Sequence, residues 1–267
     1  MDHVLNHYIL VRRLYELGFL HDRSLLCAYQ HPPQDVARSI WAYQEWHGLK
    51  CDGWCGPKTR ESLLAPRFCG HPDRMEQQSG GLCKWHDKQI TWTLAGQLPG
   101  IAANDLVEAF QLAWNYWAEV CDIQPQWLPN ERTANVTIQT GAIDGGLGTL
   151  AWSELPCGAS PRTLKQLYDS NENWVIAEGI TQGRQIDLVR VAAHEIGHVI
   201  GIPHIAAGNL LAPTYSPMVR KPQAGDIEEA VRRYGPRAGG PPPPAAAEEY
   251  VLTFRTPVTK LVIRRAA

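Results

Sequence analysis

The chain has 267 residues, enough for one large domain or for two smaller ones that each have a hydrophobic core. Its formal net charge of −2 gives no attraction to nucleic acid or to acidic membranes, so we expect neither as a partner. It contains no run of about 18 apolar residues, so we expect no membrane-spanning helix.

The N-terminus and the cysteines point to different compartments. The first eight residues lack the basic segment, apolar stretch and small-residue cleavage site of a secretory signal. Seven cysteines weakly indicate an oxidising compartment, and their odd number leaves at least one thiol unpaired within the chain. We expect a secreted or extracellular protein although no signal peptide is recognisable; an intracellular location stays open.

Residues 1–65 are predicted to form a helical domain. Apolar side chains recur at helical spacing over residues 4–19 and again over residues 36–46. A turn rich in glycine and proline follows at residues 51–60, and a third short helix is predicted at residues 59–64.

This helical stretch resembles the peptidoglycan-binding-like three-helix module. The matching residues are Ile40, Tyr43-Gln44, Gly48-Leu49, Asp52-Gly53, Gly56-Pro57 and Thr59. In bacterial hydrolases such a module can dock on cell wall, and in matrix metalloproteinases a similar one forms the propeptide. A generic turn between two helices is the alternative interpretation, and peptidoglycan stays open as a partner.

Residues 66–84 are predicted to be a switch segment and linker. Residues 66–73 resemble the cysteine switch P-R-C-G-x-P-D of metalloproteinase zymogens, with Phe68 inserted between Arg67 and Cys69. A thiolate is a soft ligand that zinc accepts readily, so the resemblance implies that Cys69 binds zinc in a latent form. The insertion leaves open whether Arg67 can make the family's salt bridge. Cys69 as half of a disulfide is the alternative.

The other cysteines allow several pairings. Cys51 and Cys55 could bridge within their loop, and Cys27, Cys83, Cys121 and Cys157 could form two further pairs that the sequence does not determine. The polar stretch at residues 74–84 is a natural place for proteolytic release of a propeptide.

A second domain is predicted at residues 85–236. Residues 89–94 alternate as a strand, a helix is predicted to begin at Asp105 and to run to about Val120, and residues 127 and 136–139 supply further strand. A helix precedes His194, and a last helix is expected at residues 226–235, with Asp226 as its N-cap.

Residues 194–204 read H-E-x-x-H-x-x-G-x-x-H. His194 and His198 are one helical turn apart on one face, and a turn at Gly201 can bring His204 round as a third nitrogen ligand. Three histidines leave one tetrahedral position of zinc open, as a catalytic site requires. Glu195 is placed to take a proton from a water in that position.

This motif marks the metzincin metalloproteases. The family also has a methionine turn downstream, which the resemblance places at Met218. The order of elements resembles the matrixin catalytic domain. The expected fold is therefore α+β: a three-helix peptidoglycan-binding-like domain followed by a matrixin domain with a mixed, twisted sheet and three helices.

Two segments before the metal-binding helix resemble the matrixin calcium site. Asp144 lies in a glycine-rich turn, and Asp169 and Glu172 belong to a segment similar to F-D-x-x-E-x-W. The resemblance implies that these three carboxylates bind one calcium ion, since hard oxygen ligands suit calcium; a polar loop without an ion is the alternative.

The strand after this turn resembles the edge strand that pairs with substrate, so Leu150, Ala151 and Trp152 are its predicted platform. The family's second, structural zinc looks absent, because Trp152 and Leu167 stand where two of its histidines would be. We therefore expect one catalytic zinc.

The sequence predicts a monomeric zinc endopeptidase made as a latent zymogen, acting on proteins or peptides. The alternatives are a cell-wall-binding protein and a hydrolase of murein peptide cross-links. Residues 237–267 read as a proline- and alanine-rich linker and a tail that alternates like a strand or hairpin.

Overall fold

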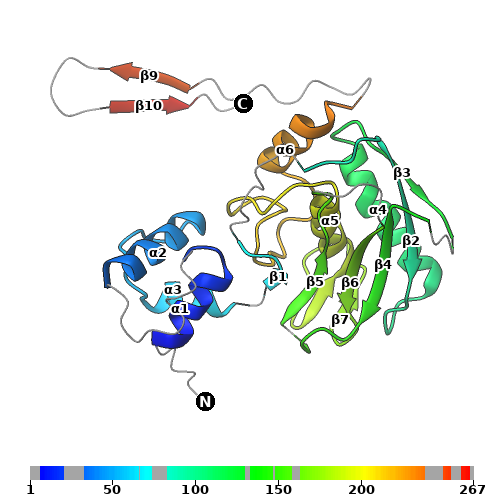
Figure 1. Cartoon of the computed structure of the whole chain (residues 1–267), viewed down its shortest axis with the longest axis horizontal. Helices are drawn as coiled ribbons and strands as arrows, with labels where there is room; N and C mark the ends of the chain where they lie inside the picture. The colour runs from blue at the N-terminus through cyan, green and yellow to red at the C-terminus, as the bar shows by residue number, and fades with distance from the viewer. Residues whose placement is uncertain are drawn as a thin grey trace.

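The computed structural model describes residues 7–20, 33–65, 67–73, 83–129, 133–146, 148–157, 163–237, 249–253 and 260–264. Residues 74–82 of the predicted release segment (residues 74–84) and Cys27 lie outside these ranges. Figure 1 shows three helices gathered beside a larger sheet-containing part, with a short strand between them.

The N-terminal helices are α1 (His7–Glu16), α2 (Pro33–Trp46) and α3 (Pro57–Leu64). They share an apolar core, separate from that of the larger part, which includes Leu14, Ile40, Tyr43 and Leu63. The buried Gln44 side chain organises the turn before α3. Its amide nitrogen donates to Asp52, Trp54 and Thr59, and its amide oxygen accepts from the backbone of Asp52 and Gly53.

The larger part contains a six-stranded sheet in the order β1-β5-β6-β4-β2-β3. Its strands are β1 (Arg67–Cys69), β2 (Gln89–Ala95), β3 (Gln124–Trp127), β4 (Val136–Gly141), β5 (Thr149–Ser153) and β6 (Leu164–Asp169). Every neighbouring pair is parallel except β5 with β6, which is antiparallel. The mixed sheet that the sequence predicts is confirmed, and it is mostly parallel.

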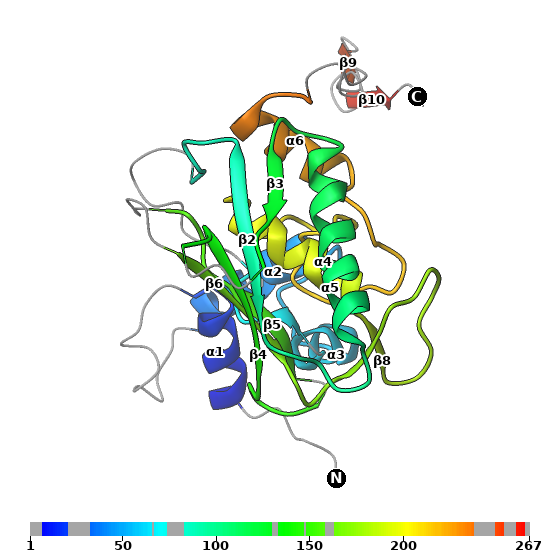
Figure 2. The ribbon, with the colours of Figure 1, turned by 90° about the vertical axis from the view of Figure 1, so that its right-hand side faces the viewer.

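Helices α4 (Ala103–Ala118) and α5 (Leu188–Val199) pack against each other beside this sheet (Figure 2). The indole nitrogen of Trp117 on α4 donates to the carbonyl of Ala193 on α5 at 2.8 Å. Helix α4 begins two residues before Asp105 and has no side-chain cap, so the predicted start at Asp105 was wrong. Asp105 instead lies in the first turn, where a carboxylate complements the helix dipole.

The remaining elements are β7 (Asn173–Val175), β8 (Gln185–Asp187), α6 (Ala224–Tyr234) and the hairpin of β9 (Glu249–Thr253) with β10 (Lys260–Arg264). A disulfide joins Cys83 to Cys157, 74 residues apart. Within the described ranges, no helix combines the length and the apolar character needed to cross a membrane.

Candidate metal centre

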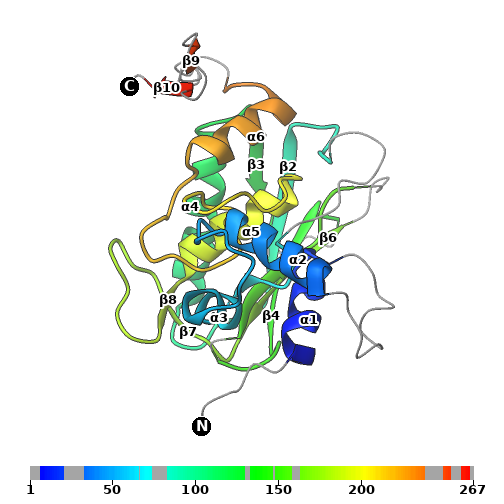
Figure 3. The ribbon, with the colours of Figure 1, turned by 90° about the vertical axis from the view of Figure 1, so that its left-hand side faces the viewer.

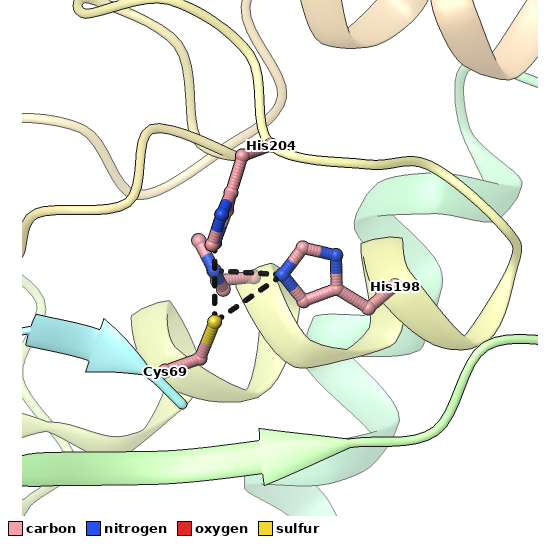
Figure 4. A group of neighbouring side chains, drawn as sticks. Cys69, His198 and His204 are labelled. Atoms are coloured by element: carbon pink, nitrogen blue, oxygen red, sulfur yellow. Dashed lines mark hydrogen bonds between the residues drawn. The ribbon is translucent and has the colours of Figure 1, made fainter. Parts of the chain in front are cut away.

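Four buried side chains converge on one point: Cys69, His194, His198 and His204. Their ligand atoms all lie within 4.8 Å of one another. The Cys69 Sγ atom lies 3.1 Å from His204 Nε2 and 3.5 Å from His198 Nε2, and the Nε2 atoms of His198 and His194 are 3.1 Å apart. Figure 4 shows Cys69 coming from β1, His198 from α5 and His204 from the loop after it.

Local backbone chemistry places the histidines. His194 and His198 are one turn apart on α5, and the helix gives way to a turn at Gly201, whose φ is 89°. A side chain at Gly201 would also collide with the Cys83 carbonyl, since an added Cβ would lie 2.0 Å from that oxygen. Glycine is therefore required at position 201 for two reasons, the positive φ and the close approach of the Cys83 carbonyl. The turn there brings the chain round to His204.

Each imidazole is fixed through its second nitrogen. The Nδ1 atoms of His194 and His198 donate to the carbonyls of Leu210 and Ile202, both at 2.8 Å. His204 Nδ1 donates to the carbonyl of Pro72 in the switch segment at 2.6 Å. These bonds leave the Nε2 lone pairs free to bind an ion, which is the arrangement metal-binding histidines use.

The donor set fits zinc. Burial lowers the pKa of His194 to about 3 and holds the pKa values of His198 and His204 well below their ordinary value, so all three rings are neutral ligands at neutral pH. Burial, and next to it the charge of Glu195, raises the pKa of the Cys69 thiol well above its usual range. Three nitrogens and one sulfur at these separations match a tetrahedral zinc site.

Glu195 follows His194 on α5 and is completely buried. Burial raises the pKa of its carboxyl to about 8, and a hydrogen bond from Ser153 opposes the shift. Ser153 Oγ lies 2.7 Å from Glu195 Oε2, whereas Oε1 has no hydrogen-bond partner in the part of the chain that the structure describes. The sequence motif did not reveal Ser153; only its position on β5 brings it to Glu195.

The switch segment keeps its salt bridge despite the inserted Phe68. The Arg67 guanidinium pairs with the buried Asp73 carboxylate, whose other oxygen lies 2.7 Å from Nε2 of His47, the residue that follows α2. Figure 3, viewed from the side of the N-terminal helices, shows α2 in front of α5. Cys69 is not disulfide-bonded, so the alternative interpretation of that residue is excluded.

The predicted substrate platform is already paired. Strand β1 lies parallel to β5 at the sheet edge, with Arg67 opposite Thr149 and Cys69 opposite Ala151. The side chains of Leu150 and Ala151 are buried, and that of Trp152 is partly exposed. The switch segment therefore occupies the edge to which we assigned the substrate.

The prediction for Met218 was wrong. Its side chain is 72% exposed, so it does not form the floor of the site. The buried turn beside the histidines is formed by residues 210–212. Leu211 packs against α5 at Gly197, where an added Cβ would lie 2.7 Å from its side chain. The turn that packs against α5 carries leucine and no methionine, so assigning the turn by residue type placed it at the wrong residue.

Asp226 holds this turn in place. It lies within α6, whose N-cap is Gln223, so the predicted N-cap role of Asp226 was also wrong. Its buried carboxylate accepts hydrogen bonds from the backbone N–H groups of Leu210, Leu211 and Gln223 at 2.7–3.0 Å. Since the Leu210 carbonyl orients His194, Asp226 supports the metal centre through one intermediate residue.

Asp226→Asn is expected to destabilise the protein by about 2 kcal/mol, because the amide NH₂ would face a backbone N–H that now has an acceptor. The looser Leu210 carbonyl should also weaken zinc binding. Thermal unfolding with and without zinc measures both effects. Glu228→Gln, an exposed change on the same helix, is the control and should alter neither; an Asn variant as stable as the wild type would contradict this role.

The three predicted calcium carboxylates do not form a comparable cluster. Among the described residues, the group with metal-ligand spacing is the one around Cys69. Asp169 accepts backbone N–H groups from Asp144, Gly145 and Asn171, and Asp144 accepts that of Thr149. Glu172 is buried. Calcium binding therefore stays a prediction.

The remaining cysteines are also placed. Cys83 pairs with Cys157, which is one of the pairings the sequence left open. Cys51, Cys55 and Cys121 are free thiols, so the possible Cys51–Cys55 bridge is not formed.

Comparisons with known proteins agree with this geometry. The family model described as matrixin matches residues 84–235, more than half of the chain. Matrix metalloproteinase-C of Caenorhabditis elegans is 26% identical over 199 residues, covering 70% of this chain and 33% of the relative. Metalloendoproteinase 1-MMP of Arabidopsis thaliana is 25% identical over 264 residues, covering 88% and 70%. Matrix metalloproteinase-18 of Xenopus laevis is 28% identical over 215 residues, covering 77% and 44%.

The chain thus spans about a third of the nematode relative and less than half of the amphibian one. The family match begins one residue after Cys83 and ends at Gly235, so it includes the sheet from β2 onward, the three helices α4 to α6 and the three histidines. On this match, the chain belongs to the matrixin family of zinc metalloendopeptidases.

Proposed function

We propose that this chain is the latent form of a zinc-dependent endopeptidase that cleaves peptide bonds in proteins. The observation that carries the proposal is the position of Cys69. Its thiol lies among the three histidines at ligand distance, and its strand covers the sheet edge beside them. A sulfur in the fourth ligand position and a blocked substrate edge both favour an inactive enzyme awaiting processing.

In the active form, His194, His198 and His204 would hold the zinc, and Cys69 would give up its place. The bound ion supplies Lewis-acid chemistry that polarises the scissile carbonyl and favours negative charge on its oxygen. Glu195 takes a proton from the attacking water and passes it to the leaving amine. Ser153 donates to one oxygen of Glu195, which keeps the other oxygen available for the proton.

The substrate is expected to bind as an added strand along β5. Residues 150–152 expose this edge once β1 has left, and main-chain hydrogen bonds to it align the peptide with the metal centre. The same edge is satisfied by β1 in the latent form, where the Gly70 N–H donates to the Ala151 carbonyl at 3.2 Å.

Helices α1–α3 act as the propeptide in this proposal. Residues 84–267 make up about two thirds of the chain, so an alignment covering 88% of it with 1-MMP must extend into the helical part. The contact between His47 and Asp73 ties the turn after α2 to the switch segment. A cut within residues 74–82 would release both together.

A secreted or extracellular location is part of the proposal. The Cys83–Cys157 disulfide supports it, since such bonds persist in oxidising compartments. Calcium binding by Asp144, Asp169 and Glu172 is proposed from the resemblance alone. The hydrogen bonds that Asp144 and Asp169 accept from the backbone account for the positions of these two carboxylates without an ion.

The test uses the full chain loaded with zinc and cut within residues 74–82 by an added protease, which is then removed. A protein substrate, a mixed peptide library and purified murein are digested in parallel and read by mass spectrometry. We expect cleavage of proteins and peptides, absent with a zinc chelator. Release of murein cross-link peptides alone would favour the cell-wall hydrolase, and binding to murein without any cleavage would favour an anchoring protein.

One zinc ion per chain is expected after dialysis against buffer with trace zinc, because one donor cluster is present among the described residues. Elemental analysis of the purified protein measures the ratio. The His198→Ala variant is the control and should bind substantially less. Two tightly held zinc ions in the wild type would contradict the prediction.

A further inference from the structure

The residue inserted into the switch segment, Phe68, is buried in the catalytic part. Its side chain is 2% exposed and belongs to the main apolar core. The ring lies flat on the imidazole of His194, with 4.4 Å between centroids and 6° between planes, and it contacts Tyr215 at 5.0 Å. An aromatic side chain thus fills a pocket whose wall is a metal-binding histidine.

The backbone of Phe68 is held on both sides, as a peptide in a cleft would be. On one side, β1 pairs with β5. On the other, the Phe68 N–H donates to the carbonyl of Pro213 at 3.1 Å, and Arg67 forms an antiparallel bridge with Thr214. The segment therefore forms a strand between β5 and residues 213–214, with the Phe68 ring directed onto His194.

The walls of this pocket do not depend on the switch segment. The Tyr215 hydroxyl accepts hydrogen bonds from the backbone of Asp187 at 3.2 Å and from Nη1 of Arg190 at 3.3 Å. The Arg190 guanidinium also lies 5.5 Å from the centre of the Tyr215 ring. His194 is fixed by the Leu210 carbonyl. Both walls should persist after Phe68 leaves.

We infer that Phe68 occupies the side-chain recognition pocket, and that this pocket selects planar aromatic side chains next to the scissile bond. Phe68 is then a second element of latency that blocks the pocket independently of the thiol of Cys69. The inference rests on the proposed endopeptidase function. It names the substrate class: peptides with phenylalanine, tyrosine or tryptophan flanking the cut.

The first test digests a peptide library of equal residue frequencies with the processed enzyme. Aromatic residues should be enriched at least about fivefold at one position flanking the cut. Tyr215→Ala, which removes one wall, should flatten that preference while cleavage continues. Cleavage without aromatic enrichment would overturn the inference and leave the endopeptidase proposal intact. A complete lack of cleavage would overturn both.

The second test measures latency without relying on activity. The full, uncut chain is treated with iodoacetamide with and without zinc, and alkylation of Cys69 is followed by mass spectrometry. Phe68→Ala should speed alkylation about tenfold, and Phe68→Leu, which keeps an apolar side chain without the ring, should fall between. The exposed change Leu64→Ala is the control. An alanine variant that is folded by circular dichroism and alkylates at the wild-type rate would overturn the role of Phe68 in latency.

Discussion

Glu195→Gln is expected to lower kcat/KM of the processed enzyme by about 10²–10⁴-fold, the usual contribution of a general base. Glutamine keeps the size of the side chain and can still accept the hydrogen bond from Ser153 Oγ. It cannot take a proton from the attacking water. The three histidines are unchanged, so zinc content should stay at the wild-type value. Peptide hydrolysis by the cut enzyme and elemental analysis of the same sample measure the two quantities.

The matched control for this substitution is Glu178→Gln, which makes the same chemical change at an exposed position. It should leave hydrolysis and zinc content unchanged. A Glu195→Gln enzyme that keeps more than about a tenth of the wild-type kcat/KM would remove Glu195 from the role of base. Loss of zinc in that variant would instead show that Glu195 acts mainly on the structure of the metal centre.

The metal ligands were the part of the site that could best be predicted from the sequence. A helical spacing of four residues and a glycine three residues later restrict where His194, His198 and His204 can point, and the structure brings them together. The strand at residues 89–94 and the helix before His194 were predictable for a similar reason, since alternation and helical spacing are local properties. The mixed sheet was expected from the resemblance to the matrixin domain.

Contacts between segments that are distant in the sequence were harder to predict. Ser153 reaches Glu195 only because β5 lies beside α5, and no spacing within either segment encodes that contact. The turn beside the histidines was wrongly assigned to Met218, because it was identified by the presence of a methionine and not by its contacts with the metal-binding helix. The pairing of Cys83 with Cys157 depends on where two loops meet, 74 residues apart.

The inserted Phe68 shows how an irregular motif can keep its contacts. An extra residue in an extended strand turns the preceding side chains to the opposite face, which would move Arg67 away from Asp73. The structure retains the Arg67–Asp73 pair and gives the inserted ring a buried place on His194. Deviation from a family motif was therefore informative about this chain, although the sequence did not reveal what the extra side chain contacts.

Cys69→Ser is expected to raise the basal activity of the uncut chain by at least about tenfold. A shift of about 1.4 kcal/mol in the free-energy difference between the blocked and open forms would produce this change. The thiol lies at ligand distance from His198 and His204, and a neutral serine hydroxyl is a much poorer zinc ligand than a thiolate. Zinc should also leave the variant faster when a chelator is added. Peptide hydrolysis and a colorimetric zinc-release assay measure the two effects.

The activity of the uncut Cys69→Ser chain should nevertheless stay below that of the processed enzyme. Its switch segment is still held by the Arg67–Asp73 pair and the β1–β5 pairing, and Pro72 still accepts from His204. Cys121→Ser changes another buried free thiol, one that donates to the Trp117 carbonyl, and should leave latency unchanged. If Cys69→Ser behaves like that control in both assays, Cys69 does not hold the metal, and latency must come from the blocked substrate edge and the pocket that Phe68 fills.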